Sequence, residues 1–287
     1  MDSALTTVGL PIALAIIMFG LGLSLTSADF RRVRQAPVAV VVALACQLLV
    51  LPAICFGLVV LLDLSPLLGI GMMLLAASPG GTSANLFSHL FRGDVALNVT
   101  LTAVNSLISI VTLPLITGLT IRYFDREDSV ELPLVEVVKV FAIVLIPVVL
   151  GMIVRSRWPA FAGRMDRPVR LGSAIILAVL VAAIVVDQRE SITGYLAKVG
   201  LATAVFCALS LSIGYFVPRL FGVGDRQAVA SSMEIGVHNA TLAIYVAVEI
   251  LDDTEISIPA AVYSLFMFAF AALWGRYISR DLAGRPA

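Results

Sequence analysis

The order of apolar and polar residues divides the chain into long apolar segments separated by short polar ones. A helix needs about 20 apolar residues to cross the hydrocarbon core of a bilayer, and nine segments come close to that length. We expect membrane-spanning helices at residues 5–27, 37–62, 66–91, 94–120, 136–154, 169–186, 196–217, 226–249 and 257–278. The pattern therefore predicts an all-α polytopic membrane protein.

Composition agrees with this prediction and limits the domain organisation. Hydrophobic residues make up 60% and charged residues 13% of the 287 positions, whereas soluble domains carry roughly 25% charged residues. The longest loops that we expect, the polar stretches 121–135 and 155–168, are short, so we expect a single transmembrane unit over residues 1–287 with no attached soluble domain. The net charge is zero and no basic block occurs, which argues against nucleic acid as a partner.

The arginines and lysines predict an orientation, because cytoplasmic loops carry the excess of basic residues. With the N-terminus outside, the outer side holds only Arg122, Arg126, Lys139, Arg189 and Lys198. The other 14 of the 19 basic residues then lie inside: Arg31, Arg32, Arg34, Arg92, Arg155, Arg157, Arg164, Arg167, Arg170, Arg219, Arg226, Arg276, Arg280 and Arg285. We expect nine spans with a cytoplasmic C-terminus, in a form that suits a bacterial inner membrane.

Two of the predicted spans are interrupted near their middle by polar motifs that contain glycine, at residues 78–85 and 234–239. In the first motif Pro79 lacks a backbone donor, and Gly80 and Gly81 permit close backbone approach. A broken helix inside a bilayer persists only where it lines a cavity or binds a ligand. The alternative is a proline kink whose small residues serve helix packing.

The interrupted spans occupy corresponding positions in two halves of the chain. The polar stretch 121–135 separates a first repeat, residues 1–120 with spans one to four, from a second repeat, residues 121–287 with spans five to nine. The third and eighth spans cross in opposite directions, as inverted repeats require. Two broken helices related in this way are typical of secondary transporters.

Glu234 is a carboxylate placed near the middle of the eighth span, where ionisable residues are costly and usually functional. Gly236, His238 and Asn239 follow within one and a half turns. A carboxylate beside amide and backbone oxygens suits a small hard cation such as sodium. Two alternatives remain open: a protonated Glu234 hydrogen-bonded within the bundle, and a proton relay between Glu234 and His238.

Several motifs together carry a resemblance to a known family. They are Ile17 to Leu23 followed by Asp29 and Phe30, Gln47 with Pro52 five residues later, Pro79 to Asn85, Arg92 to Leu97, and Glu234 to Asn239. Over nearly its whole length the chain resembles the bile acid:sodium symporters, in their nine-helix form. The resemblance implies an inverted-repeat transporter with two discontinuous helices crossing at mid-membrane, and a core domain and a panel domain that move in alternating access.

The same resemblance implies two sodium sites and a substrate site. The first sodium site would use Asn85, Asn98, Thr102 and Glu234. The second would use Gln47, Glu234 again, the carbonyls of Ile235 and Val237, and the side chain of His238. Thr82 and Asn239 would contact the substrate. Three positions depart from the family pattern: Ala84 stands where a ligating serine is usual, Asn98 replaces a second serine, and His238 replaces a glutamine.

Three classes of function follow from these observations. The preferred one is sodium-coupled symport of an organic anion, either bile-salt-like or a small carboxylate, with Na⁺ as the coupled ion. The second is a proton-coupled or uncoupled carrier on the same fold. The third, an intramembrane enzyme, is remote, and we expect no enzymatic activity. The expected partners are the substrate and the lipid bilayer, with no obligatory protein partner. The sequence leaves open the substrate, the number of coupled ions, the oligomeric state and the source organism.

Overall fold

A computed structural model describes residues 10–125, 134–187 and 192–280, and helices form nearly all of this part of the chain. The helices are α1 (Leu10–Ser24), α2 (Ser27–Arg32), α3 (Pro37–Ala45), the π-helix η2 (Cys46–Val50), α4 (Leu51–Leu61), α5 (Pro66–Ala77), α6 (Thr82–Leu90), α7 (Val95–Tyr123), α8 (Leu134–Arg157), α9 (Pro159–Asp187), α10 (Ile192–Leu220), α11 (Asp225–Gly236), α12 (Ala240–Tyr245), the π-helix η3 (Val246–Ile250) and α13 (Thr254–Ile278).

The predicted spans correspond closely to these helices, and the all-α fold is confirmed. By length and composition alone, four described stretches could cross a membrane: Pro37–Leu61, Val95–Tyr123, Val199–Leu220 and Thr254–Ile278. The third and eighth spans are each divided into two shorter helices, α5 with α6 and α11 with α12. Residues 5–9 of the first span, and most of the polar stretch 121–135, lie outside the described residues.

The expected loop at residues 155–168 was wrong. Only Trp158 separates α8 from α9, and α9 begins at Pro159. Backbone hydrogen bonds continue across the junction, from Trp158 N to Val154 O at 2.8 Å and from Ala162 N to Trp158 O at 3.0 Å. Proline fits the first position of a helix because its missing N–H would have no partner there, so the helix extends beyond its apolar part.

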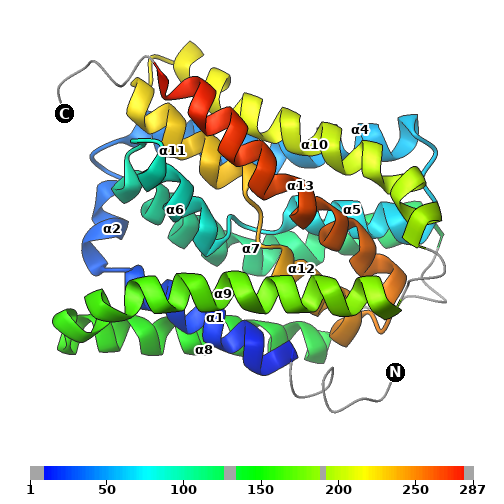
Figure 1. The fold of residues 1–287 in the computed structure, drawn as a ribbon, viewed down its shortest axis with the longest axis horizontal. Coiled ribbons are helices and arrows are strands. Elements are labelled where there is room, and N and C mark those ends of the chain that lie inside the picture. The colour runs from blue at the N-terminus through cyan, green and yellow to red at the C-terminus, as the bar shows by residue number, and fades with distance from the viewer. Residues whose placement is uncertain (1–9, 126–133, 188–191, 281–287) are drawn as a thin grey trace.

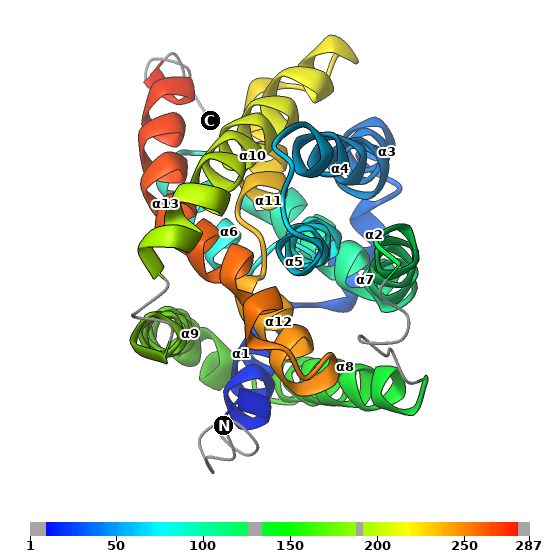
Figure 2. The same ribbon diagram turned by 90° about the vertical axis from the view of Figure 1, so that its right-hand side faces the viewer.

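The helices form two packed groups. Helix α1 packs against α8 and α9, and we call these three helices the panel. The other helices form the core, in which α10 packs against α11 and α13, and α5 packs against α7 and α13. Figure 2 shows the panel at the bottom, with α12 directly above α1 and most of the other core helices farther up. This arrangement agrees with the expected division into core and panel.

Two glycines allow very close packing inside the panel. A Cβ atom at Gly22 of α1 would overlap the backbone carbonyl of Val148 on α8. A Cβ atom at Gly151 of α8 would overlap the backbone of Phe19 and of Gly22 in return. Small residues at such interfaces let helix backbones approach each other within a membrane. The panel is therefore held by direct backbone contact between α1 and α8.

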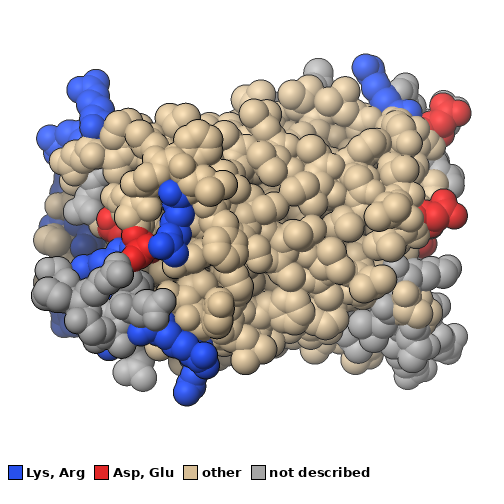
Figure 3. Space-filling model, turned by 90° about the horizontal axis from the view of Figure 1, so that it is seen from above, with Lys and Arg blue, Asp and Glu red and all other residues tan. Residues whose placement is uncertain are grey.

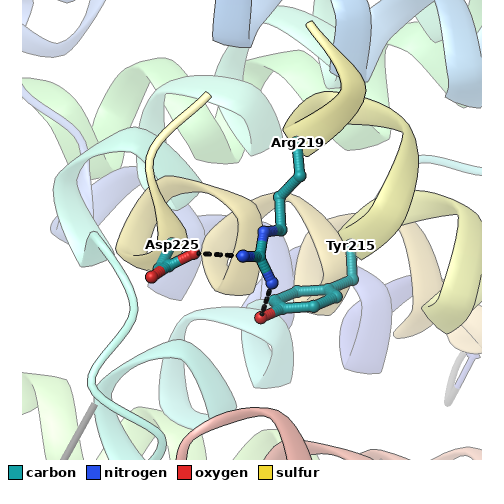
Figure 4. A network of polar contacts seen from close by, with 3 residues as sticks. All are labelled: Tyr215, Arg219 and Asp225. Carbon is teal, nitrogen blue, oxygen red and sulfur yellow. Dashed lines mark hydrogen bonds and ion pairs between the residues drawn. The ribbon is translucent and has the colours of Figure 1, made fainter. Parts of the chain in front are cut away.

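A polar network joins the end of α10 to the start of α11 (Figure 4). The Arg219 guanidinium donates to the Tyr215 hydroxyl at 2.7 Å and forms an ion pair with Asp225 at 3.0 Å. The same guanidinium lies over the Tyr215 ring, 5.1 Å from its centroid. Asp225 is the first residue of α11. The network thus fixes where α11 begins, and α11 is the helix that carries Glu234.

The surface has an apolar belt between two charged ends. Figure 3 shows a broad middle band free of charged side chains on the visible face, with most of the lysine and arginine side chains at one end. Large apolar side chains such as Leu61, Leu115 and Leu220 are well exposed. A surface of this kind is stable in lipid rather than in water. The chain is an integral membrane protein.

Candidate functional site

The two interrupted spans cross each other through their backbones. After α5 ends at Ala77 and α11 ends at Gly236, short extended connections pass each other in opposite directions (Figure 1). The Gly81 N–H donates to the Val237 carbonyl and the Asn239 N–H donates to the Pro79 carbonyl, each at 2.8 Å. These bonds form an isolated antiparallel bridge between Gly80 and His238. The crossover thereby satisfies backbone groups that would be costly inside a bilayer.

Four helix ends meet at this crossover. The carboxyl ends of α5 and α11 bring partial negative charge, and the amino ends of α6 and α12 bring partial positive charge. Gly81 precedes α6, and Asn239 caps α12 by accepting from the Leu242 N–H at 3.1 Å. Such a site has places for both a cation and an anion.

Glu234 lies behind the crossover with its carboxylate against Gly80. Its side chain is 2% exposed, and a Cβ atom at Gly80 would overlap the carboxylate group. The Thr102 hydroxyl donates to Glu234 Oε2. The other oxygen, Oε1, is buried and meets no donor at hydrogen-bonding geometry among the described residues, although the Gly80 N–H and the Asn105 side chain lie near the carboxylate. One oxygen of a buried carboxylate is therefore open to a ligand.

Asn98, one turn before Thr102 on α7, has a fixed orientation. Its Nδ2 donates to the Ser88 hydroxyl and to the Ala230 carbonyl, both at 2.8 Å. A carbonyl can only accept, so the amide nitrogen must face Ala230 and the oxygen must face the other way. Asn98 Oδ1 is buried without a hydrogen-bond partner among the described residues, and so is Asn85 Oδ1.

Contacts connect three of the four residues expected at the first sodium site, and the fourth, Asn85, lies on the neighbouring helix α6. Glu234 contacts the Thr102 hydroxyl, which also lies 3.0 Å from the Asn98 backbone carbonyl, and the Asn98 side chain contacts Ser88. Asn85 lies three residues before Ser88 on α6. The open atoms of this set are all oxygens. The donor set is that of a hard cation. Within the described residues no group of three or more His, Cys, Asp or Glu side chains could hold a metal ion.

Two of the residues expected at the second sodium site, Gln47 and His238, meet at the Ser78 carbonyl. Gln47 Nε2 donates to this carbonyl at 3.1 Å, and His238 Nδ1 lies 3.2 Å from it. Gln47 Oε1 and His238 Nε2 are both buried and without hydrogen-bond partners in the described part of the chain. The Val237 carbonyl already accepts from Gly81. The structure thus brings Gln47 and His238 together, with a ring nitrogen among the candidate ligands.

The His238 ring has aromatic neighbours. It stacks on Phe206 at a centroid distance of 5.6 Å and an interplanar angle of 20°. It meets Tyr263 edge-on at 5.4 Å and 70°. The Tyr263 hydroxyl donates to the Gly236 carbonyl at 2.8 Å, so this tyrosine is itself fixed in place.

Thr82 and Asn239 stand at the starts of the two crossover helices that contact the panel. Thr82 begins α6 and Asn239 precedes α12, and both of these helices contact α1 and α9. Glu234 lies on α11, which contacts α7 and α10 in the core. Two cavities, of about 500 and 520 Å³, lie elsewhere, beside the α4–α5 connection and between α10 and α13.

Sequence reasoning missed four residues that shape the site. Ser88 orients Asn98, Tyr263 holds the Gly236 carbonyl, and Phe206 stacks on His238. Asn105 was also missed: it is buried and faces the Glu234 carboxylate. Asn105 follows Thr102 by three residues and so shares its helix face, a signal that the sequence did contain. Tyr263 and Phe206 give no comparable signal, because only the tertiary packing brings them to the crossover.

The fold and the crossover define a polytopic membrane transporter built on two broken helices. Comparison with known proteins identifies its family. The model described as the sodium bile acid symporter family matches residues 11–195, and the chain belongs to this family. Its members are transporters rather than enzymes, and the resemblance inferred from the motifs is confirmed.

Known relatives match almost the whole chain. It is 26% identical over 277 residues to the uncharacterized sodium-dependent transporter YocS of Bacillus subtilis, covering 95% of this chain and 85% of the relative. It is 26% identical over 278 residues to the probable chloroplastic sodium/metabolite cotransporter BASS2 of rice, covering 96% of this chain and 64% of that relative. It is 26% identical over 274 residues to the human ileal sodium/bile acid cotransporter, covering 94% of this chain and 78% of that relative. These similarities support sodium-coupled transport.

Proposed function

We propose that this protein carries an organic anion across the membrane together with sodium, by alternating access. The observation that carries the proposal is the buried Glu234 carboxylate, which has one open oxygen directly behind the helix crossover. A charged group is costly there unless a counter-charge accompanies it. Sodium supplies that charge and makes occupation of the site depend on the ion gradient.

The first sodium site uses Glu234, Asn85, Asn98 and Thr102. Buried oxygens without hydrogen-bond partners on the first three of these residues support this choice, because an unsatisfied buried polar atom is costly unless a ligand meets it. Thr102 supplies a hydroxyl that already contacts the carboxylate. Ala84, also on α6, is fully buried and offers no oxygen ligand from its side chain. The site therefore has one side-chain ligand fewer than the family pattern.

The second set of residues is Gln47, Glu234, the carbonyls of Ile235 and Val237, and His238. The side chains of Gln47 and His238 both contact the Ser78 carbonyl, which supports their assignment to the same site. An imidazole nitrogen is a poor ligand for sodium. These residues therefore fit a sodium ion less well than the first set does.

Thr82 and Asn239 contact the substrate, which lies between the core and the panel. Asn239 uses Oδ1 to cap α12, and its Nδ2 makes no hydrogen bond to the described residues. The first N–H groups of α6 have no partner within that helix and favour negative charge. A carboxylate, either of a bile-salt-like molecule or of a small metabolite, suits this combination.

Alternating access follows from the same arrangement. The ligands of the ion lie on core helices, and the substrate residues lie at the starts of α6 and α12, the helices that contact α1 and α9 of the panel. A movement of the panel against the core opens the crossover to one side or the other. We place the protein in a bacterial inner membrane, with the N-terminus outside, and keep residues 1–120 and 121–287 as its two inverted repeats.

A proton relay between Glu234 and His238 is the competing mechanism. The side-chain hydrogen bond of Glu234 is with Thr102, whereas His238 bonds the Ser78 carbonyl. No hydrogen bond joins the two side chains to each other in the described structure. This geometry favours sodium over a relayed proton.

Thermal unfolding of the purified protein in detergent tests the proposal. Titration with sodium chloride against potassium chloride at matched ionic strength should give a saturable, sodium-specific rise in melting temperature, since a ligand of the folded state stabilises it. Glu234→Gln should abolish this rise, and the control Glu249→Gln, outside both ion sites, should retain it. Sodium-dependent uptake of taurocholate, lactate or pyruvate into proteoliposomes then tests transport. Equal responses to sodium and potassium would exclude sodium coupling.

A further inference from the structure

We propose that the His238 side chain takes the place of a second sodium ion, so that transport in this protein is coupled to one sodium ion. This inference rests on the proposed sodium-coupled transport and concerns its stoichiometry. The relevant position is the Ser78 carbonyl at the carboxyl end of α5, where the broken helix exposes partial negative charge.

Two hydrogen-bond donors already satisfy that carbonyl. Gln47 Nε2 donates to it at 3.1 Å, and His238 Nδ1 lies 3.2 Å away. Because a backbone carbonyl can only accept, the bond requires the hydrogen of the imidazole to be on Nδ1. The positive end of an N–H dipole therefore lies where the exposed helix end would otherwise attract a cation.

The packing around the ring keeps this donor in place. His238 is 1% exposed, with Phe206 stacked on one side and the edge of Tyr263 beside it. Tyr263 cannot turn away without giving up its 2.8 Å hydrogen bond to the Gly236 carbonyl. Rotating the imidazole to present its other nitrogen would break the bond to Ser78 and disturb both ring contacts. The N–H donor is thus built into the crossover.

The remaining atoms of the second set do not make a sodium site. The Val237 carbonyl accepts from the Gly81 N–H at 2.8 Å. His238 contributes a nitrogen where a hard cation prefers oxygen. The oxygens that remain are the open Gln47 Oε1, the Ile235 carbonyl, and a carboxylate that the first site also uses. Each open atom of the first set, by contrast, is an oxygen.

The matched experiment replaces each of the two histidines of the chain in turn. Isothermal titration calorimetry of the detergent-solubilised protein with sodium chloride, in choline chloride of matched ionic strength, uses sodium alone as the probe. We expect the unmodified protein to bind one ion with a Hill coefficient of about 1, because that coefficient cannot exceed the number of sites. His238→Gln supplies an amide oxygen and should bind two ions. His89→Gln, at an exposed position on α6, should bind one.

A double variant tests whether the gained ion uses the expected place. Adding Gln47→Leu to His238→Gln should return the count to one ion, because it removes an oxygen of the second set. Two ions bound by the unmodified protein would overturn the inference, and so would a single ion bound by His238→Gln. The number of sodium ions bound by the unmodified protein tests the inference even where a variant fails to fold. If it binds no sodium at all, the proposed function itself is wrong, and that result differs from both of the others.

Discussion

The carboxylate of Glu234 fills the space in which a side chain at Gly80 would begin. The two residues come from different broken spans, 154 positions apart in the sequence. Gly80 also forms the backbone bridge with His238. The absence of a Cβ atom at position 80 therefore leaves room for the Glu234 carboxylate directly against the crossover.

Gly80→Ala should abolish sodium-specific stabilisation. The new methyl group must displace the carboxylate of Glu234, which cannot then keep its contact with Thr102. Overpacking of a buried site costs about 1–3 kcal/mol, so the melting temperature without sodium should also fall. Gly57→Ala is the control, since a Cβ atom at Gly57 meets no atom within 4 Å. A sodium response of normal size in Gly80→Ala would contradict the assignment of Glu234 as a ligand.

Thr102→Val should weaken sodium binding by about tenfold, equivalent to about 1.4 kcal/mol. Valine keeps the shape of threonine but removes the hydroxyl that contacts Glu234 and that we assign as a ligand. Thr100→Val is a matched control on the same helix, because the Thr100 hydroxyl bonds the backbone of Asp29 and Ala96 instead. Sodium affinities from calorimetry should separate the two variants. Equal affinities would place the ion elsewhere.

Ala84→Ser should strengthen sodium binding several-fold, by adding a hydroxyl where the family pattern has one. Ala84 is fully buried, and Asn85, an assigned ligand, follows it directly on α6. Ala103→Ser adds the same atom at another buried position, on α7, and should leave the affinity unchanged. If both variants bind sodium like the unmodified protein, the first site does not reach position 84.

The apolar spans could be predicted because the bilayer imposes a minimum length on them. Pro37–Leu61, Val95–Tyr123 and Thr254–Ile278 all lie within a few residues of the expected bounds. The prediction of a loop at residues 155–168 was wrong because hydropathy reports which solvent a segment prefers, not whether it is helical. A helix satisfies its own backbone in water as well as in lipid, so α9 extends through its basic, polar start at Pro159.

The sequence predicts those features of the candidate site that depend on residues close together in the chain. Asn98 and Thr102 are four residues apart and share a helix face, and the broken motifs locate the crossover. The orientation of Asn98 depends on Ser88 and Ala230, which only the packing of α6, α7 and α11 brings together. The aromatic neighbours of His238 likewise come from α10 and α13, and no local pattern connects them.

Gly22→Val should destabilise the panel without changing the ion site. The added side chain must overlap the Val148 carbonyl, and α1 can avoid this only by moving away from α8. We expect a loss of at least about 1–3 kcal/mol in unfolding free energy, together with a sodium affinity that stays normal in the fraction that folds. Gly172→Ala, also in the panel, has no atom within 4 Å of its new Cβ and should unfold like the unmodified protein. Because the ion ligands lie on core helices, a sodium affinity that fell with Gly22→Val would show that the panel takes part in forming the ion site.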